Sequence, residues 1–126
     1  MTRRGLFAPA LGLLAAACSP LALLNTFGPR DGGVRRAARD IAYGDDPRQT
    51  FDVFAPMEQR ERPWPVLVLF YGGGWDSGDK THYAWAAQAL AARGFVVALP
   101  DYRLVPQVHF PAFIEDAALA TARVGE

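Results

Sequence analysis

Two apolar runs, residues 65–71 and 95–100, are the feature that most limits what this chain can fold into. They read PVLVLFY and FVVALP and lack the polar alternation of a strand with one solvent face, so each predicts a strand covered on both faces. The intervening HYAWAAQALAARG places apolar residues at helical spacing and ends at Gly94, a typical helix stop. Together these segments predict one βαβ unit with a right-handed crossover. We expect its first strand to be central in the sheet.

The sequence on either side of this unit predicts three further elements. DIAYG at 40–44 and TFDVFAP at 50–56 are strand candidates separated by the turn-rich DDPRQ, which suits an antiparallel pair at a sheet edge. A second helix is predicted from Pro111, a favoured first-turn residue, with Glu115 and Asp116 near its positive end. These elements indicate an α/β layer structure.

The first residues have the features of an export signal. Arg3 and Arg4 precede the apolar GLFAPALGLLAAAC, which is interrupted and too short for a membrane span. Three alanines lead into Cys18, the only cysteine. This arrangement resembles a bacterial lipoprotein signal with the thiol as lipid acceptor, although Ala15 stands where such signals usually carry Leu. The alternative is a plain signal peptide or an anchor.

The domain boundaries follow from these assignments. We expect a signal at residues 1–18, a linker at 19–38 and one folded domain at 39–126. The linker is predicted because NTFGPRDGGVRRAARD mixes glycine, proline and charge without apolar periodicity. The protein is then expected in the bacterial periplasm, or attached to a membrane through lipid on Cys18.

Composition argues against several other classes. Thirteen Lys and Arg residues balance thirteen Asp and Glu, so nucleic acid is not an expected partner. Two histidines, His82 and His109, lie far apart without a metal-binding spacing. We expect no metal and no cofactor.

Three glycines, residues 72–74, follow the first buried strand. Glycine permits close backbone approach and positive φ, so three in succession leave N–H groups free to point at one place. Acyl-transfer enzymes need such donors for the oxyanion of the tetrahedral transition state, and losing one typically costs roughly 3 to 4 kcal/mol. A phosphate-binding turn or a simple tight bend would use the same residues.

The surrounding residues resemble a known family. FYGGGWDSGDK is similar to the H-G-G-G-W oxyanion turn of the α/β-hydrolase fold, in the esterase and lipase branch that includes hormone-sensitive-lipase-like and BD-FAE-like carboxylesterases. DYRLVPQVHFPAFIEDA, residues 101–117, resembles the same branch's Y-R-L-A-P-E, F-P-A and E-D stretch. The resemblance covers about residues 40–126. It implies the N-terminal part of a three-layer αβα fold with a mostly parallel sheet.

The resemblance also implies roles for individual residues. Gly73 and Gly74 would be the backbone donors of the oxyanion hole, and Trp75 would help to shape the acyl pocket. Tyr71 stands where the family often has His; it either braces the turn by hydrogen bonding beside the substrate pocket or is a buried aromatic that closes the strand. Val105 and Gln107 also replace the family's Ala and Glu.

Two other residues of the second motif, Arg103 and Asp116, are expected to pin the loop to the second helix.

The catalytic nucleophile is not among these residues. In this fold a serine lies on a G-x-S-x-G elbow, and the acid and histidine follow it. Ser19 and Ser77 are the only serines, and neither lies between elbow glycines. Ser77 is expected to be a turn residue, and His82 and His109 surface or packing residues. We expect the elbow on the order of 20 to 30 residues beyond Glu126.

The predicted function is therefore hydrolysis of a small carboxylic ester by a serine mechanism, with this chain supplying the oxyanion turn but no nucleophile, acid or histidine. On its own the chain is expected to be inactive. A related possibility is an amide such as an aryl formamide. The alternative from another class is a non-catalytic exported lipoprotein or binding module derived from the same fold.

Overall fold

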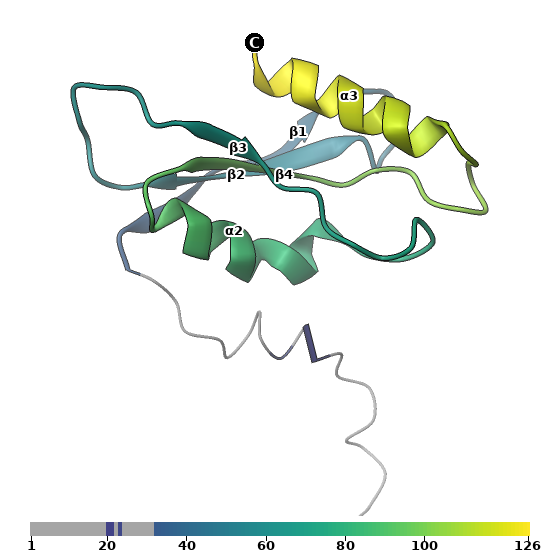
Figure 1. The fold of residues 1–126 in the computed structure, drawn as a ribbon, viewed down its shortest axis with the longest axis horizontal. Helices are drawn as coiled ribbons and strands as arrows, with labels where there is room; N and C mark the ends of the chain where they lie inside the picture. The colour runs from purple at the N-terminus through teal and green to yellow at the C-terminus, as the bar shows by residue number, and fades with distance from the viewer. Residues whose placement is uncertain (1–19, 22, 24–31) are drawn as a thin grey trace, which may run out of the picture.

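The structure, a computed structural model, describes residues 20, 21, 23 and 32–126. Its elements within 32–126 form a four-stranded sheet in the order β1-β2-β4-β3 with helices on its faces (Figure 1). In chain order they are β1 (Val34–Ala42), β2 (Thr50–Pro56), β3 (Val66–Val68), the 3₁₀ helix η1 (Lys80–Tyr83), α2 (Ala84–Ala91), β4 (Val96–Pro100) and α3 (Ala112–Val124).

The sheet is mixed, which corrects the prediction of a mostly parallel sheet. Among the described strands, β3 and β4 pair in parallel, as the βαβ unit requires, whereas β1 with β2 and β2 with β4 are antiparallel. The position of β3 was also predicted wrongly. Among the described strands, β3 lies at one edge of the sheet. Strand β4 is internal, because β2 and β3 pair with its two opposite sides.

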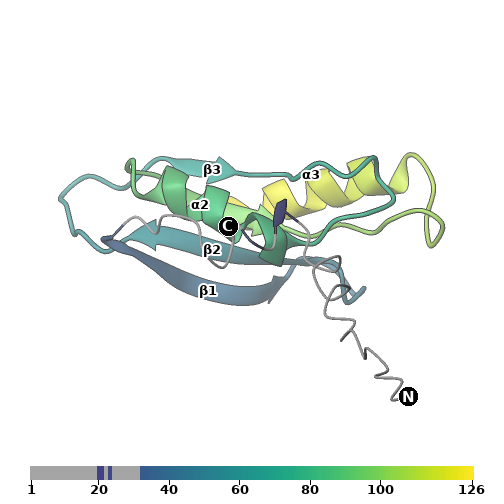
Figure 2. The same ribbon diagram turned by 90° about the horizontal axis from the view of Figure 1, so that it is seen from below.

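The sheet lies between the two helices, so the predicted αβα layers are present. Figures 1 and 2 show α2 on one face and α3 on the other. Strand β4 alternates between the two apolar clusters: Val97 and Leu99 pack on the α2 side, and Ala98 packs with Ala120 of α3 on the other. Because successive strand residues point to opposite faces, the unbroken apolar run of β4 is explained by burial on both sides.

The helix of the βαβ unit begins and ends through local signals. Before η1, the Asp79 carboxylate accepts a hydrogen bond from the N–H of Thr81 at 2.8 Å, a typical N-cap. Ala84, Ala87 and Ala91 form the buried stripe of α2, and their small side chains let the helix lie close to the sheet. Gly94, at a positive φ of 96°, follows the helix as predicted.

Strand β1 begins at Val34, inside the range predicted as linker. Its residues alternate between half-buried and exposed up to Arg39. Arg36 accounts for this because its guanidinium lies 5.1 Å from the centre of the Phe54 ring and 3.7 Å from the Asp52 carboxylate. The aliphatic part of an arginine can cover apolar surface, so a charge-rich segment forms a regular edge strand.

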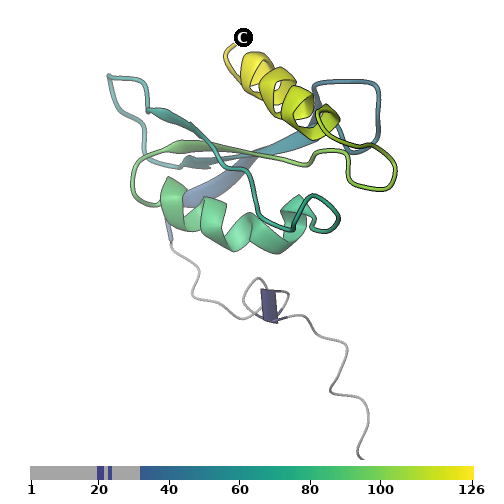
Figure 3. The same ribbon diagram turned by 45° about the vertical axis from the view of Figure 1, so that its right-hand side comes forward.

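Three loops meet at one end of the sheet, beyond the carboxyl ends of β3 and β4 (Figure 3). They are the β1–β2 loop, the segment from β3 to η1 and the β4–α3 loop. Their contacts are direct: the N–H of Val105 donates to the carbonyl of Trp75 at 2.9 Å, and Arg48 Nε donates to the carbonyl of Tyr102 at 2.8 Å. Loops at the carboxyl ends of parallel strands are where α/β proteins bind ligands.

Candidate active site

In the segment 72–79, here called the glycine turn, the carbonyl groups of Gly72 and Gly73 are both hydrogen-bonded. The Gly72 carbonyl accepts from the hydroxyl of Tyr83 at 3.3 Å. The Gly73 carbonyl accepts from the N–H groups of Asp76 and Ser77, at 3.3 and 3.2 Å, and from Ser77 Oγ at 2.9 Å. These bonds fix the orientation of two successive peptide groups.

The N–H groups of the same two peptides face the opposite way. In a trans peptide the C=O and N–H point in opposite directions, so the bonds to the carbonyls of Gly72 and Gly73 turn the N–H groups of Gly73 and Gly74 away from those partners. Within residues 32–126, neither N–H donates a hydrogen bond to another backbone group. The turn therefore presents two backbone donors without acceptors.

Two of the three glycines are required by the geometry of the turn. A Cβ on Gly73 would lie 2.1 Å from the carbonyl oxygen of Ser77, closer than atoms can approach. Gly74 has a φ of 63°, in the left-handed region that side chains disfavour. A Cβ on Gly72, by contrast, would meet nothing within 4 Å. The sequence GGG thus combines one open position with two constrained ones.

Trp75 also has a positive φ, 69°, which is unusual for a residue with a side chain. Surrounding contacts hold it in place. Its ring stacks on Phe113 of α3 with 4.6 Å between ring centres and meets Tyr102 edge-on at 5.5 Å, and its carbonyl accepts from Val105. Trp75 remains 42% exposed, so part of the indole is available to a ligand.

An open pocket of about 350 Å³ adjoins the turn. The predicted pocket residues Trp75 and Tyr71 both contribute to it, although the Tyr71 hydroxyl is turned toward Asp101. The complete lining consists of Phe70, Tyr71, Gly72, Gly73, Gly74, Trp75 and Tyr102. The pocket therefore combines aromatic walls with the backbone of the glycine turn.

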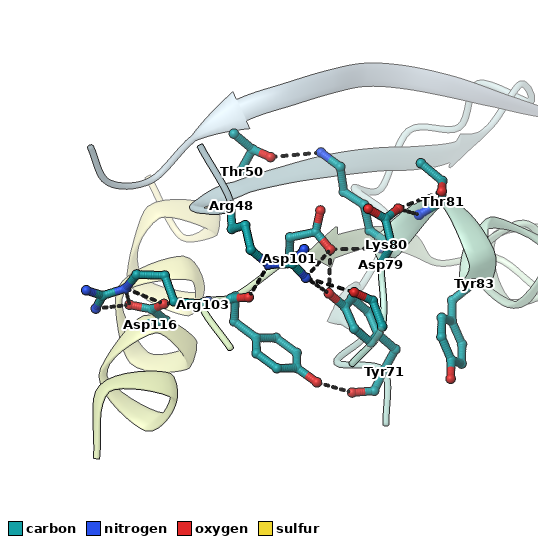
Figure 4. A network of polar contacts seen from close by, with 12 residues as sticks. Arg48, Thr50, Tyr71, Asp79, Lys80, Thr81, Tyr83, Asp101, Arg103 and Asp116 are labelled. Atoms are coloured by element: carbon teal, nitrogen blue, oxygen red, sulfur yellow. Dashed lines mark hydrogen bonds and ion pairs between the residues drawn. The ribbon is translucent and has the colours of Figure 1, made fainter. Parts of the chain in front are cut away.

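Tyr71 combines both roles that its position allowed. It is 5% exposed and stacks between Tyr83 and Tyr102, and its hydroxyl donates to Asp101 Oδ1 at 2.5 Å (Figure 4). Burial, followed by the bond to Asp101, raises the pKa of Tyr71 far above its ordinary value, so the phenol stays protonated as a donor. Burial also raises the pKa of Asp101.

Arg48 and Asp101 are central to this network, and the sequence analysis did not single them out. Asp101 directly follows β4, and Arg48 lies in the β1–β2 loop. An acidic residue at the carboxyl end of a buried strand was a usable signal for Asp101. For the Arg48 side chain no local pattern exists, because the groups to which its guanidinium donates lie at least 23 residues away.

Lys80 lies at the other end of the glycine turn and is 4% exposed. Its ammonium is paired with Asp52 at 2.9 Å and Asp40 at 2.5 Å and donates to Thr50 Oγ1 at 2.9 Å. Burial opposes the charge, but the bonds to Asp40 and Asp52 outweigh it and raise the pKa of Lys80. Paired in this way, Lys80 is a structural cation rather than a free base.

Arg103 and Asp116 connect the β4–α3 loop to α3, as predicted. Arg103 Nη2 lies 2.7 Å from Asp116 Oδ1, and the Arg103 N–H donates to Oδ2 at 2.9 Å. Gln49 Nε2 adds a further bond to Asp116 at 2.8 Å. Burial opposes the Asp116 charge, but the bonds from Arg103 outweigh it and lower the pKa of Asp116.

The remaining candidates take no part in the pocket. Ser77 is a turn residue bonded to Gly73, and His82 and His109 are exposed, as predicted. Cys18 lies outside the described residues. In the part of the chain that the structure describes, no group of His, Cys, Asp and Glu residues could hold a metal ion, and no helix has the length and apolar character to cross a membrane.

Comparison with known proteins identifies a family and relatives among esterases. The family model described as BD-FAE matches residues 51–124. Esterase LipC from Mycobacterium tuberculosis is 38% identical over 85 residues, covering 67% of this chain and 21% of LipC. The probable isoprenylcysteine alpha-carbonyl methylesterase ICME from Oryza sativa is 37% identical over 84 residues, covering 67% of this chain and 20% of ICME.

Solved structures show the same likeness. Esterase B from Lactobacillus rhamnosis superposes with a TM-score of 0.68 at 27% identity, covering 74% of this chain and 30% of that protein. The hormone-sensitive-lipase homologue EstE7 from a metagenome library superposes with a TM-score of 0.64 at 27% identity, covering 82% of this chain and 33% of EstE7.

Fold and relatives together place the chain in the α/β-hydrolase class to which these esterases belong. Within that class the chain belongs to the BD-FAE family. It spans about a fifth of the length of the two curated relatives that it matches.

Proposed function

We propose that this chain supplies the oxyanion hole of a serine carboxylesterase that acts on small-molecule esters. The observation that carries the proposal is the orientation of the glycine turn: within residues 32–126 the Gly72 carbonyl is bonded to Tyr83 and the Gly73 carbonyl within the turn, while the N–H groups of Gly73 and Gly74 have no backbone acceptor. In acyl transfer, such donors stabilise the negative oxygen that forms when the nucleophile attacks the ester carbonyl.

In the proposed reaction, this chain holds the oxyanion and contacts the acyl group. A serine hydroxyl attacks the ester carbonyl, the oxyanion is held by Gly73 and Gly74, the alcohol departs, and water releases the acid. The aromatic side of the pocket, with Trp75 and Tyr102, would contact the acyl group. Ser77 is not proposed as the nucleophile, because its hydroxyl is bonded within the turn. The proposal takes the nucleophilic serine, its acid and its histidine from outside these residues.

We also propose that the protein is exported, either to the bacterial periplasm or to a membrane to which it is attached by lipid. The sequence of residues 1–18 is the basis for export and for lipid on Cys18.

The esterase relatives do not favour the non-catalytic alternative, because their names are those of enzymes.

The glycine turn can be tested by placing residues 51–124 in the matching position of esterase LipC and measuring hydrolysis of p-nitrophenyl butyrate. Gly73→Ala should lower kcat by about 10²- to 10³-fold with a much smaller change in KM, because its Cβ would clash with the Ser77 carbonyl and move the N–H donors out of position. Gly72→Ala is the matched control, because a Cβ there meets no atom within 4 Å. Equal effects of the two substitutions would refute the assignment.

A further inference from the structure

One carboxylate oxygen holds both ends of the glycine turn. Asp101 Oδ1 accepts from the hydroxyl of Tyr71, just before the turn, at 2.5 Å and from the N–H of Lys80, just after it, at 2.8 Å. Asp101 is itself fixed, because its N–H donates to the Thr50 carbonyl at 2.9 Å and its carbonyl accepts from Tyr43 at 2.6 Å. The span between the two ends of the turn is therefore set by a residue of another loop.

The Arg48 guanidinium adds a second connection to the same two ends. Its Nη2 donates to the Tyr71 hydroxyl and to the Gly78 carbonyl, both at 2.9 Å, while Nε donates to the Tyr102 carbonyl. Nη2 also lies 3.6 Å from Asp101 Oδ1. The planar fork of arginine makes several such bonds with fixed geometry, which a lysine cannot do. Figure 4 shows Arg48, Tyr71 and Asp101 converging at this point.

Neither Arg48 nor Asp101 lines the pocket beside the turn. Placing charged groups in a half-buried cluster is costly, and apolar side chains often give equal or greater stability. What this cluster provides instead is geometry, since it ties together the β1–β2 loop, both ends of the glycine turn and the residue after β4.

We propose that Arg48 and Asp101 are positioning residues for the glycine turn: by joining Tyr71, Gly78 and Lys80 they hold the N–H groups of Gly73 and Gly74 in their outward orientation. We call Arg48 and Asp101, with their bonds to Tyr71, Gly78 and Lys80, the clamp. Its role in catalysis rests on the proposed function. The clamp itself is a property of the chain and can be measured without turnover.

The test is hydrogen exchange of the 126-residue chain at low micromolar concentration, resolved to single amides. The N–H of Lys80 reports on Asp101, and the N–H of Ser77 reports on the turn through the Gly73 carbonyl. Arg48→Met should speed exchange at both amides by about tenfold or more, because bonds to charged groups are lost locally. Exchange in α2 and β4 should stay unchanged.

Three further substitutions keep this test decisive. Tyr71→Phe removes only the hydroxyl shared by Arg48 and Asp101 and should speed exchange at the same amides even if Arg48→Met fails to fold. Arg60→Met is the matched control, because Arg60 also donates to two carbonyls, those of Arg62 and Pro63, but in the loop before β3. Arg48→Lys should not restore protection, since the charge alone does not supply the fork.

The clamp is refuted if Tyr71→Phe leaves both amides as protected as before, if Arg48→Lys restores full protection, or if Arg60→Met has the same effect as Arg48→Met. In any ester-hydrolysing form of the protein, Arg48→Lys should lower kcat more than it raises KM. A Gly73→Ala substitution that leaves kcat intact would remove the proposed function, but it would not alter the exchange result.

Discussion

The Tyr71 side chain supports the start of the glycine turn through its buried ring and its hydroxyl. Its ring is buried between two other tyrosines, and its hydroxyl joins Asp101 to Arg48. Because the pKa of Tyr71 is raised by burial and by Asp101, the phenol keeps its proton, and so its donated bond, across the range in which most proteins are folded. The backbone that follows is free to present N–H groups to a ligand.

Asp116 should make stability depend on pH. In the folded chain the pKa of Asp116 is lowered from its ordinary value of 3.8. Its contribution to the free energy of unfolding is therefore fully present above pH 3.8 and is lost as the pH falls through the lower pKa of the folded state. Asp116→Asn should cost on the order of 2 kcal/mol at pH 7, because it weakens the hydrogen bonds that a buried carboxylate accepts from Arg103 and Gln49. The cost should shrink below about pH 4.

Urea unfolding of the dilute chain at several pH values measures this effect. Glu115→Gln is the matched control, because Glu115 is exposed on the same helix. A cost for Asp116→Asn that is independent of pH would show that the Arg103 pair is not its source.

Cys18 is the residue on which the proposed location depends. If the chain is processed as a lipoprotein, material extracted from membranes should lack the first 17 residues, counted to Ala17, and carry lipid on the new terminal cysteine. Intact-mass measurement distinguishes the cases. An unmodified Met1 terminus would exclude export by this route, and cleavage without lipid would leave a plain signal peptide.

Among the elements, β3 differs most from expectation. The apolar run extends to Tyr71, but the strand covers only Val66–Val68, because the chain then leaves the sheet to form the glycine turn. Strand β4 is paired on both sides. Among the described strands, β1 and β3 form the two outer edges of the sheet, and Val66 of β3 is 59% exposed.

An apolar strand with an unpaired edge favours association between chains. The isolated chain is therefore expected to aggregate as its concentration rises, and Val66→Lys should raise the concentration at which this happens by roughly several-fold, because a charged side chain blocks pairing. Light scattering against concentration measures the effect. Leu119→Lys, at an exposed apolar position of α3, is the control, and an equal gain from it would implicate general apolar surface.

For the molecule as a whole, the proposed oxyanion donors are present without an activated nucleophile among the described residues. The donors of the glycine turn, the aromatic pocket and the clamp are all present in residues 32–126. Neither exposed histidine contacts Ser77 in this part of the chain, and the Ser77 hydroxyl donates to the Gly73 carbonyl. The covalent step thus has no activated nucleophile here.

The purified 126-residue chain should accordingly hydrolyse p-nitrophenyl butyrate no faster than a buffer blank. The physical reason is that donors for an oxyanion give no turnover unless a nucleophile first creates that oxyanion. Robust hydrolysis would contradict this expectation. A Ser77→Ala variant would then show whether the turn serine is the source.

Local pattern was sufficient to predict four of the elements and the position of the turn. The buried runs, the stop at Gly94 and the helix after Pro111 are signals within a few residues, and β2, α2, β4 and α3 formed where they were predicted. The role of Gly73 and Gly74 stays a prediction, although their unpaired N–H groups are what it requires.

Tertiary structure alone decided the strand order, the start of β1 and the clamp behind the turn. Arg48 meets Tyr71, Gly78 and Tyr102 across separations of 23, 30 and 54 residues, and no local propensity records such partners. Strand order likewise depends on which edge of β4 receives β2, a choice made by packing of the whole sheet. Periodicity along the chain reveals which residues are buried, but only folding in three dimensions determines which distant residues they meet.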